Sequence, residues 1–402
     1  MNPLNQLKPT TAVILIGFLV VCFGALNEAH AVITDPEDYF PGGNTAAGQG
    51  ALLNVNLDQG QFNTAIGLLS LSGITEGDFN TGVGAATLFV NTANNNTATG
   101  AAALFSNTIG EDNTANGVAA LARNIEGSWN TAFGSQALTA NTGYDNTAIG
   151  FQALSSNTDG SSNIAVGRNA LLNTTLGTNN TCIGRDALLL NTIGGNNTGV
   201  GFGSLQMNTS GTQNIGLGSF AGFNVTTAFN VIAIGSLGAN VNFSTWIDNI
   251  YGITPQSGTT VPVVVSDGGQ LGTVASAARF KQDIATMDKT SEIILSLRPV
   301  TFHYKTDARK TPQFGLIAEE VAKVNPALVL PDKDGKPFTV RYDAVNAMLL
   351  NEFLKEHRKV EKLEAALRAV NERLSEQDAK IQKVSAQLKL SQSVPRTVLN
   401  NQ

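Results

Sequence analysis

The nine residues NTAIGFQAL, at positions 146–154, are one copy of a unit that recurs through the first half of the chain. Successive copies begin 16 to 19 residues apart, a period too short for a helix pair or a propeller blade and typical of one coil of a β-solenoid. Glycine follows the first eleven starting asparagines by four positions, where a backbone corner is expected, and leucine follows the first ten by eight, where it fills the interior. The starting asparagines are Asn44, Asn63, Asn80, Asn96, Asn113, Asn130, Asn146, Asn163, Asn180, Asn197, Asn214 and Asn230.

The start of each copy alternates between two faces, as in Asn146–Gly150 and Asn163–Gly167. This pattern predicts a strand of four or five residues with one face turned inward, and stacked coils then form a parallel rod. Asparagine at one repeated position predicts a hydrogen-bonded ladder along the rod. Each coil has few large aliphatic side chains, so burial within one rod gains little free energy. We therefore favour several rods packed along an apolar seam, with a lone solenoid as the alternative.

These repeats resemble the head domains of trimeric bacterial surface adhesins, in which three left-handed parallel β-rolls pack side by side. The resemblance covers about residues 43–240 and rests on the pattern of small residues, glycine, asparagine and threonine. It implies a homotrimeric, adhesin-like fibre. The repeat is longer than the usual unit of those adhesins, so the cross-section of a coil differs.

Charge divides the 402 residues into two parts that join near residue 275. Residues 32–275 contain 14 acidic and three basic side chains, whereas residues 276–402 contain 16 acidic and 21 basic ones. The negative charge of the first part argues against nucleic acid as a partner. With only three histidines in the chain, we expect no metal cluster and no cofactor.

The first 31 residues are predicted to be a signal peptide. Lys8 precedes an apolar run at 11–26, and Ala29-His30-Ala31 has the small-x-small form of a cleavage site. This apolar run is shorter than a membrane-spanning helix usually is, although an uncleaved anchor is the alternative. We therefore expect a secreted or cell-surface protein with no membrane span in the mature chain. Its one remaining cysteine, Cys182, replaces the alanine of its coil and should be buried.

The stretch GTVASAARFKQDI, at residues 272–284, carries the chemical motif. It resembles the start of the self-cleaving intramolecular chaperone domain of endosialidase and other phage tail-spike proteins, the S74 peptidase family, whose motif is Ser-Asp-x-Arg-x-Lys-x-Asp-Ile. The chain has Ala277 where that motif has its first aspartate. The positions that agree are Ser276, Arg279, Lys281, Asp283 and Ile284, and further similar blocks lie at 297–304, 314–321 and 340–343.

The resemblance implies that Ser276 is the nucleophile, that Lys281 is its general base, and that the bond between Ala275 and Ser276 is cut. Lysine accepts a proton only when neutral, which requires desolvation or a cationic neighbour. Arg279 would be that neighbour or would bind the oxyanion, with Asp283 in a supporting position. Side chains five residues apart face opposite ways on a straight strand, so either the backbone bends or the pair forms between chains.

A helix is predicted from Asp343, a suitable N-cap, to about Leu390. Its apolar residues recur in steps of three and four, which indicates a coiled-coil seam, with an amphipathic helix packed on its own domain as the alternative. The seam consists of Val360, Leu363, Leu367, Val370, Leu374, Gln377, Ile381, Val384 and Leu388.

The predicted fold is therefore mainly β: a repetitive parallel β-solenoid rod, then a small α+β chaperone domain that ends in a long coiled-coil helix. The predicted boundaries are 1–31 for the signal peptide, 32–42 for a linker, 43–242 for about twelve coils, 243–275 for a β neck, 276–342 for the chaperone domain, 343–390 for the helix and 391–402 for a flexible tail.

The sequence supports two functions. In the first, the chain is a secreted homotrimeric fibre. Its coiled coil aligns the ends of the chains and so fixes the register of the rods, and the chaperone domain is then released by Ser-Lys autoproteolysis. In the second, the solenoid binds a surface glycan or ice and keeps a chaperone cap that has lost its chemistry because of Ala277. A threonine repeated once per coil would form the binding face of that second protein. These threonines are Thr45, Thr64, Thr81, Thr97, Thr114, Thr131 and Thr147.

Overall fold

The computed structural model describes residues 41–253, 260–266 and 268–392, which fall into two compact units that divide after residue 258. The predicted signal peptide, most of the linker and the last ten residues of the tail lie outside the described residues. Within the described ranges, no helix is both long enough and apolar enough to cross a membrane.

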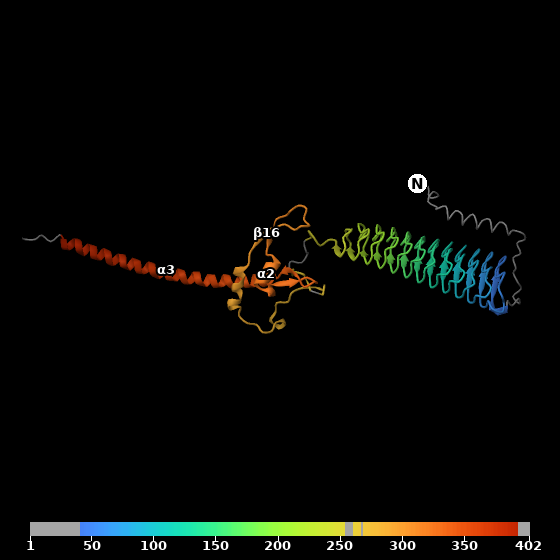
Figure 1. Ribbon diagram of the computed structural model, residues 1–402, viewed down its shortest axis with the longest axis horizontal. Helices are drawn as coiled ribbons and strands as arrows, with labels where there is room; N and C mark the ends of the chain where they lie inside the picture. The colour runs from blue at the N-terminus through green and yellow to red at the C-terminus, as the bar shows by residue number, and fades with distance from the viewer. Residues whose placement is uncertain (1–40, 254–259, 267, 393–402) are drawn as a thin grey trace, which may run out of the picture. The chain divides into compact units, whose positions relative to one another are not determined.

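The first unit is a parallel β-solenoid, so the predicted fold class is confirmed (Figure 1). Thirteen strands form one sheet in sequence order, and each strand pairs with the next at the same position of the repeat, as Thr114 does with Thr131. A short 3-10 turn, η2 (Pro41–Gly43), precedes the sheet. The strands are β1 (Thr45–Ala47), β2 (Thr64–Ile66), β3 (Thr81–Val83), β4 (Thr97–Thr99), β5 (Thr114–Asn116), β6 (Thr131–Phe133), β7 (Thr147–Ile149), β8 (Ile164–Val166), β9 (Thr181–Ile183), β10 (Thr198–Val200), β11 (Ile215–Leu217), β12 (Val231–Ile234) and β13 (Ser244–Ile247).

Each coil bends sharply at its glycine, which shortens most strands to three residues instead of the predicted four or five. In β5 the middle residue, Ala115, is buried while its two neighbours face outward. The strand ends just before Gly117, whose φ is 137°. A Cβ there would lie 2.5 Å from the backbone of Gly134 in the next coil. Glycine is therefore required at this corner both for its φ angle and for the close approach of two coils, as the repeat predicted.

The repeated leucines form the apolar column of the rod. Leu121 is fully buried and has a φ of 52°, a left-handed conformation that costs an L-residue about 1–2 kcal/mol. Burial of a leucine side chain contributes about 1.5–3 kcal/mol, which offsets that cost. Cys182 occupies the alanine position of its coil and is fully buried, as predicted. Burial raises the pKa of its thiol.

The starting asparagines form the predicted ladder. The backbone N–H of Asn130 donates to Oδ1 of Asn113 at 3.0 Å, and its Nδ2 donates to the same oxygen at 3.1 Å. Asn113 in turn donates from Nδ2 to the carbonyl of Gly127 at 2.9 Å. Because each amide joins two coils and also closes a turn within its own, every buried polar group in this column contributes to the stacking.

A second asparagine ladder, three positions after the repeated leucine, was not predicted. Nδ2 of Asn124 donates to Oδ1 of Asn107 at 2.7 Å and to the carbonyl of Gly127 at 2.7 Å, and both asparagines are fully buried. The interior of the rod is therefore polar as well as apolar. One chain buries this interior by itself. The small number of aliphatic side chains in each coil did not predict that.

The outward face of the sheet is irregular. The seven repeated threonines lie on its outer side, flanking the buried middle residues. The companion positions, two residues later, include Ile66, Asn116 and Phe133. A surface that mixes amide, aromatic and aliphatic side chains is not the flat, regular threonine array on which the ice-binding interpretation depends.

The rod also extends further than predicted. Strand β13 was expected to lead out of the rod, but it pairs in parallel with β12, from Val231 opposite Ser244 to Ile234 opposite Ile247. A Gly-rich turn follows later in the chain. It joins β14 (Val264–Val265) to β15 (Leu271–Gly272) as an antiparallel pair.

The second unit has a small core formed by Val321, Leu328 and Val340. The long helix begins at Tyr342, so Asp343 lies in its first turn and not at the predicted N-cap position. The elements are the 3-10 segments η3 (Ala278–Phe280), η4 (Asp288–Ser296) and η5 (Pro326–Leu328), the paired strands β16 (Val300–Phe302) and β17 (Gln313–Gly315), the paired strands β18 (Val329–Pro331) and β19 (Pro337–Val340), and the helices α2 (Ala318–Val324) and α3 (Tyr342–Gln392).

Candidate active site

Ser276 and Lys281 lie within hydrogen-bond distance of each other in one chain. Nζ of Lys281 is 3.2 Å from Oγ of Ser276. The single turn of η3 lies between them and is closed by bonds from Phe280 N to Ala277 O at 3.0 Å and from Lys281 N to Ala278 O at 2.9 Å. Of the two arrangements that the sequence left open, the structure has the bend. The roles of the two side chains in catalysis remain a prediction.

Ala277, which departs from the family motif, is the N-cap residue of η3. Its φ and ψ are −66° and 144°, and no side chain caps the turn. Aspartate is among the residues most favoured at an N-cap, because its carboxylate accepts a hydrogen bond from a free backbone N–H. Alanine at this position has no carboxylate to cap the turn, while the serine hydroxyl and the lysine amine are in contact.

Arg279 and Asp283 are not part of this contact. The guanidinium of Arg279 lies over the ring of Phe280, with Cζ 4.6 Å from the ring centroid. Asp283 has a φ of 55° and is exposed. Within the described residues, neither side chain makes a hydrogen bond or ion pair with Ser276 or Lys281.

The site is open to water in the single chain, since every residue from 276 to 286 is exposed. Among them, Phe280 and Ile284 are large apolar residues with most of their surface in solvent. A lysine acts as a general base only where its charge is disfavoured, and a dry environment is the usual way to achieve this. The single chain therefore has the geometry of a Ser-Lys pair but does not exclude water from that pair.

The same segment is where the chain matches a known family. Residues 276–330 match the family model Peptidase_S74, described as the chaperone of endosialidase. This segment is similar to that family. The match confirms the resemblance seen in the sequence and begins at Ser276, although it ends before the block at 340–343 that also resembled the family. No curated protein and no solved structure matches the chain.

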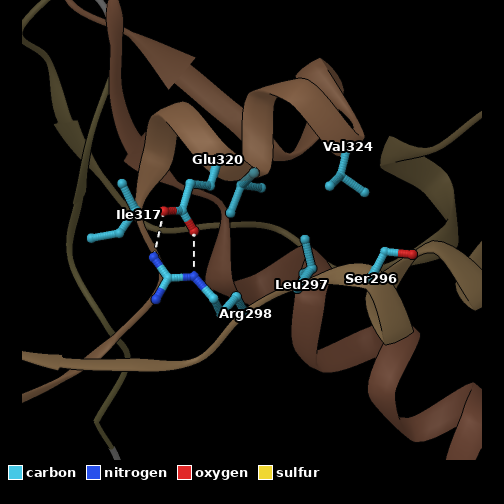
Figure 2. A pocket seen from close by; sticks show the side chains of 7 residues that line it. Ser296, Leu297, Arg298, Ile317, Glu320 and Val324 are labelled. Carbon is cyan, nitrogen blue, oxygen red and sulfur yellow. Dashed lines mark hydrogen bonds and ion pairs between the residues drawn. The ribbon is translucent and has the colours of Figure 1, made fainter.

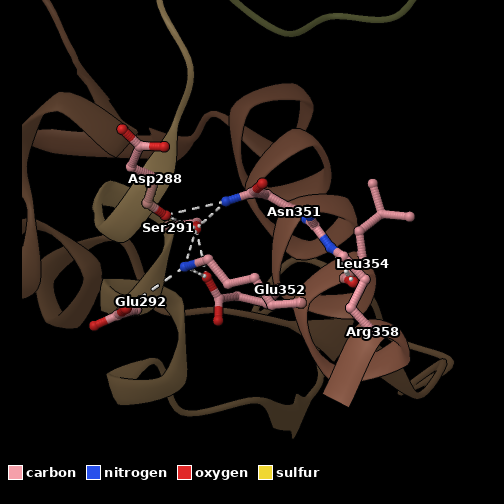
Figure 3. Close-up of polar contacts among 8 residues, drawn as sticks. Asp288, Ser291, Glu292, Asn351, Glu352, Leu354 and Arg358 are labelled. Carbon is pink, nitrogen blue, oxygen red and sulfur yellow. Dashed lines mark hydrogen bonds and ion pairs between the residues drawn. The ribbon is translucent and has the colours of Figure 1, made fainter. Parts of the chain in front are cut away.

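A second serine and lysine meet within the second unit, the part of the chain after residue 258, which is called the chaperone unit after its family match. Sequence reasoning missed this contact (Figure 3). Ser291 on η4 is fully buried, and its Oγ contacts Oε1 of Glu352 and lies 2.7 Å from Nδ2 of Asn351. Nζ of Lys355 is 3.4 Å from the same Oγ and 2.7 Å from Oε1 of Glu352.

This second pair is structural. The hydrogen bond to Glu352, together with the nearby Glu292, raises the pKa of Lys355, and the bonds from Lys355 and Ser291 lower the pKa of Glu352. A lysine held in its charged form cannot take a proton from serine. These bonds instead fasten η4 to the first turns of α3.

A bidentate ion pair fastens the next part of the unit (Figure 2). Nε of Arg298 donates to Oε2 of Glu320 at 3.1 Å, and its Nη2 donates to Oε1. The hydrogen bond from Arg298 lowers the pKa of Glu320, and that carboxylate raises the pKa of Arg298. The small cavity beside this pair, of about 60 Å³, is too small for a substrate.

The larger hollow of this unit is apolar. It is an open groove of about 680 Å³ whose lining includes Leu297, Phe314 and Leu349. Phe314 is 80 % exposed and Phe353, one helical turn after Leu349, is 65 % exposed. Positions 349 and 353 continue the spacing of the predicted seam towards the start of α3. Leu349 of the groove and the seam therefore share one face of α3, with Glu356 at the position between Phe353 and Val360.

Proposed function

We propose that the chain is a secreted homotrimeric fibre in which the chaperone unit gathers three chains and is then released by cleavage between Ala275 and Ser276. The observation that carries the proposal is the Ser276–Lys281 contact at 3.2 Å, at the first residue of the segment that matches the endosialidase chaperone model. A parallel solenoid that precedes such a segment fits a tail-spike or adhesin-like fibre.

The chemistry needs only these two side chains and water. Oγ of Ser276 attacks the carbonyl carbon of Ala275 while Lys281 accepts the hydroxyl proton. Lys281 then gives that proton to the departing amide nitrogen of Ser276, which leaves an ester between the two residues. One water molecule hydrolyses the ester, so the products are a carboxylate on Ala275 and a free amine on Ser276 with its hydroxyl restored.

Assembly supplies what the single chain lacks. The seam of α3 is exposed along its length, as are Phe280 and Phe314. Association of three chains through these side chains would bury them and exclude water from the nearby serine and lysine. Cleavage would then follow assembly and would leave a fibre that is kinetically trapped without the part that assembled it.

The rods also offer a surface to one another. The outward column of the sheet includes Ile66, Phe133, Ile149 and Ile183, all of which are exposed in one chain. Neighbouring rods that pack through this column could slip by one coil, because adjacent coils are nearly identical. A seam that joins the chain ends at one level removes the slipped arrangements.

Denaturing gel electrophoresis of the purified full chain tests the cleavage. We expect two fragments that meet between Ala275 and Ser276 and one intact band for Ser276→Ala. Lys281→Ala and Lys281→Arg should also give one band, because neither side chain can accept the proton at a usable pH. Thr273→Ala, which removes an exposed hydroxyl three residues earlier, is the matched control and should be cut like the wild type.

Ala277→Asp sharpens the test, since an aspartate there should hold η3 and speed cutting. An uncut wild type that is cut after Ala277→Asp would show that this chain keeps its chaperone as a permanent cap. Cutting that persists in Ser276→Ala would exclude Ser276 as the nucleophile.

A further inference from the structure

One edge of the rod carries two cationic side chains in successive coils, with an aromatic side chain in the coil on either side. Phe151, Arg168, Arg185 and Phe202 each follow the corner glycine of their coil, and their strands β7 to β10 are successive neighbours in the sheet. The four residues, here called the Phe-Arg corner, are therefore about 4.8 Å apart from one coil to the next.

The two guanidinium groups lean away from each other. Cζ of Arg168 lies 6.0 Å from the ring centroid of Phe151, in the preceding coil, and Cζ of Arg185 lies 5.2 Å from that of Phe202, in the following coil. Like charges on neighbouring strands repel, whereas an aromatic face attracts a cation. Each guanidinium is therefore drawn towards its own phenyl ring and away from the other guanidinium.

Arg185 is held in place by a short chain of polar contacts. Its Nε donates to Oδ2 of Asp186 at 2.9 Å, and Nδ2 of Asn169 donates to the other oxygen of Asp186 at 2.9 Å. The side chain of Asp186 is 12 % exposed, whereas that of Arg185 is 61 % exposed. Among the described residues, the Nη groups of Arg185 have no hydrogen-bond partner, so their donors face solvent.

The local charge is opposite to that of the whole rod. Two of the three basic residues between 32 and 275 lie in this corner, and Asp186 is the one acidic residue between 160 and 247. The other acidic side chains of the coils, such as Glu111 and Glu126, come just before a starting asparagine and so lie in a different turn of the coil. An anion that approaches the Phe-Arg corner meets a net positive charge.

We propose that the Phe-Arg corner binds an acidic sugar of the uronate class. The carboxylate would lie between the two arginines, whose planar forks match its two oxygens. The phenyl rings would contact the apolar faces of the neighbouring sugars. The distance from Phe151 to Phe202 is three coil steps, roughly 14 Å, which is long enough for a short oligosaccharide. This inference does not depend on trimerisation or cleavage.

Isothermal titration calorimetry of the full chain with tetragalacturonate, and with neutral maltotetraose, tests the proposal. We expect tetragalacturonate to bind and maltotetraose to bind at least tenfold more weakly. Arg168→Ala with Arg185→Ala should weaken tetragalacturonate binding more than tenfold, and Phe151→Ala or Phe202→Ala severalfold. Lysine at both arginine positions should give an intermediate loss, because lysine keeps the charge without the fork.

Arg123→Ala is the matched control, because Arg123 is the remaining arginine of the rod and lies on another coil. It should bind as the wild type does. Equal binding by the double alanine variant, or equal binding of both sugars, would overturn the proposal. A wild type that does not bind tetragalacturonate would also overturn it. Light scattering of the double variant shows separately whether the two substitutions change the mass of the assembly.

Discussion

The rod and the chaperone unit differ in how completely one chain buries its large apolar side chains. In the rod, the repeated leucine and the two columns of asparagine are fully buried within one chain, as at Leu121 and Asn130. In the chaperone unit, the fully packed apolar residues are Val321, Leu328 and Val340, whereas much larger side chains such as Phe314 remain exposed. One chain completes the first structure and leaves the second with an apolar surface uncovered.

The difference indicates which unit needs partners. A coil adds to the coil before it, so connectivity alone sets the pairing of strands within one rod. The chaperone unit has no such internal repeat, and its long helix exposes an apolar seam to solvent. We infer that contacts between chains begin in the chaperone unit, and that the rods acquire their mutual register from it.

Leucine substitutions in the two units should separate their roles most strongly. Leu121→Ala should lower the free energy of unfolding by about 2.7–5 kcal/mol at any protein concentration, because it opens a cavity in a closed core. Leu367→Ala, at a position 60 % exposed in one chain, should leave the rod unchanged and weaken association. Urea unfolding at two protein concentrations, in a Ser276→Ala background, measures both. A concentration-dependent loss for Leu121→Ala would contradict a core closed within one chain.

The asparagine ladder should be the next most sensitive feature. Asn130→Ala removes the amide that joins Asn113 to the next coil and leaves buried backbone groups without partners, at a cost of about 1–3 kcal/mol. Asn116→Ala, on the outward face of β5, should change the free energy of unfolding by less than about 0.5 kcal/mol. Chemical unfolding of the two variants checks the difference, and equal losses would show that the ladder adds nothing.

Thr174→Asn should stabilise the rod. Thr174 interrupts the second ladder, and Oδ1 of Asn157 in the preceding coil is buried without a hydrogen-bond partner in the described structure. An amide at 174 can donate to that oxygen, as Asn157 donates to Asn141 at 2.6 Å, for a gain of about 0.5–1.5 kcal/mol. Thermal unfolding should show a raised midpoint for Thr174→Asn and a lowered one for Thr174→Val, which lacks the hydroxyl. A lowered midpoint for both would contradict the ladder.

The smallest expected effect is the response of the chaperone unit to acid. The pKa of Glu352 is lowered by its bonds to Lys355 and Ser291, so its contribution to stability is complete above the ordinary glutamate pKa of about 4.3 and is lost as the pH falls through the lowered value. Hydrogen exchange in η4 should therefore rise below about pH 4. In Glu352→Gln it should already be raised at pH 6 and change less with pH, and an unchanged rate in the wild type would show that this contact does not hold η4.

The repeat made much of the rod predictable. The same residue type recurs at each of these positions in about a dozen coils, so the roles of Gly117, Leu121 and Asn130 could be predicted from their spacing. The second ladder was less visible, because valine or isoleucine takes its position in the end coils, as at Ile74 and Val225. Strand β13 was misplaced because it begins at Ser244 with no starting asparagine before it.

The candidate site was predictable only through its motif. Ser276 and Lys281 stood out by resemblance, but the bend that joins them is made by Ala278–Phe280, which contains neither proline nor glycine to indicate a turn. The contact of Ser291 with Glu352 joins residues 61 positions apart. No local pattern connects such a pair, because it depends on how η4 packs against α3.

The central claim is that assembly through the seam of α3 completes the cleavage site. Its most direct test is the variant Leu367→Asp with Leu374→Asp, in which Ser276 and Lys281 are intact. Light scattering and a denaturing gel of the same sample should show a trimeric, cut wild type and a variant of single-chain mass that remains one uncut band. A variant that has single-chain mass and is cut as completely as the wild type would contradict the claim, since the serine and lysine would then act without any partner chain.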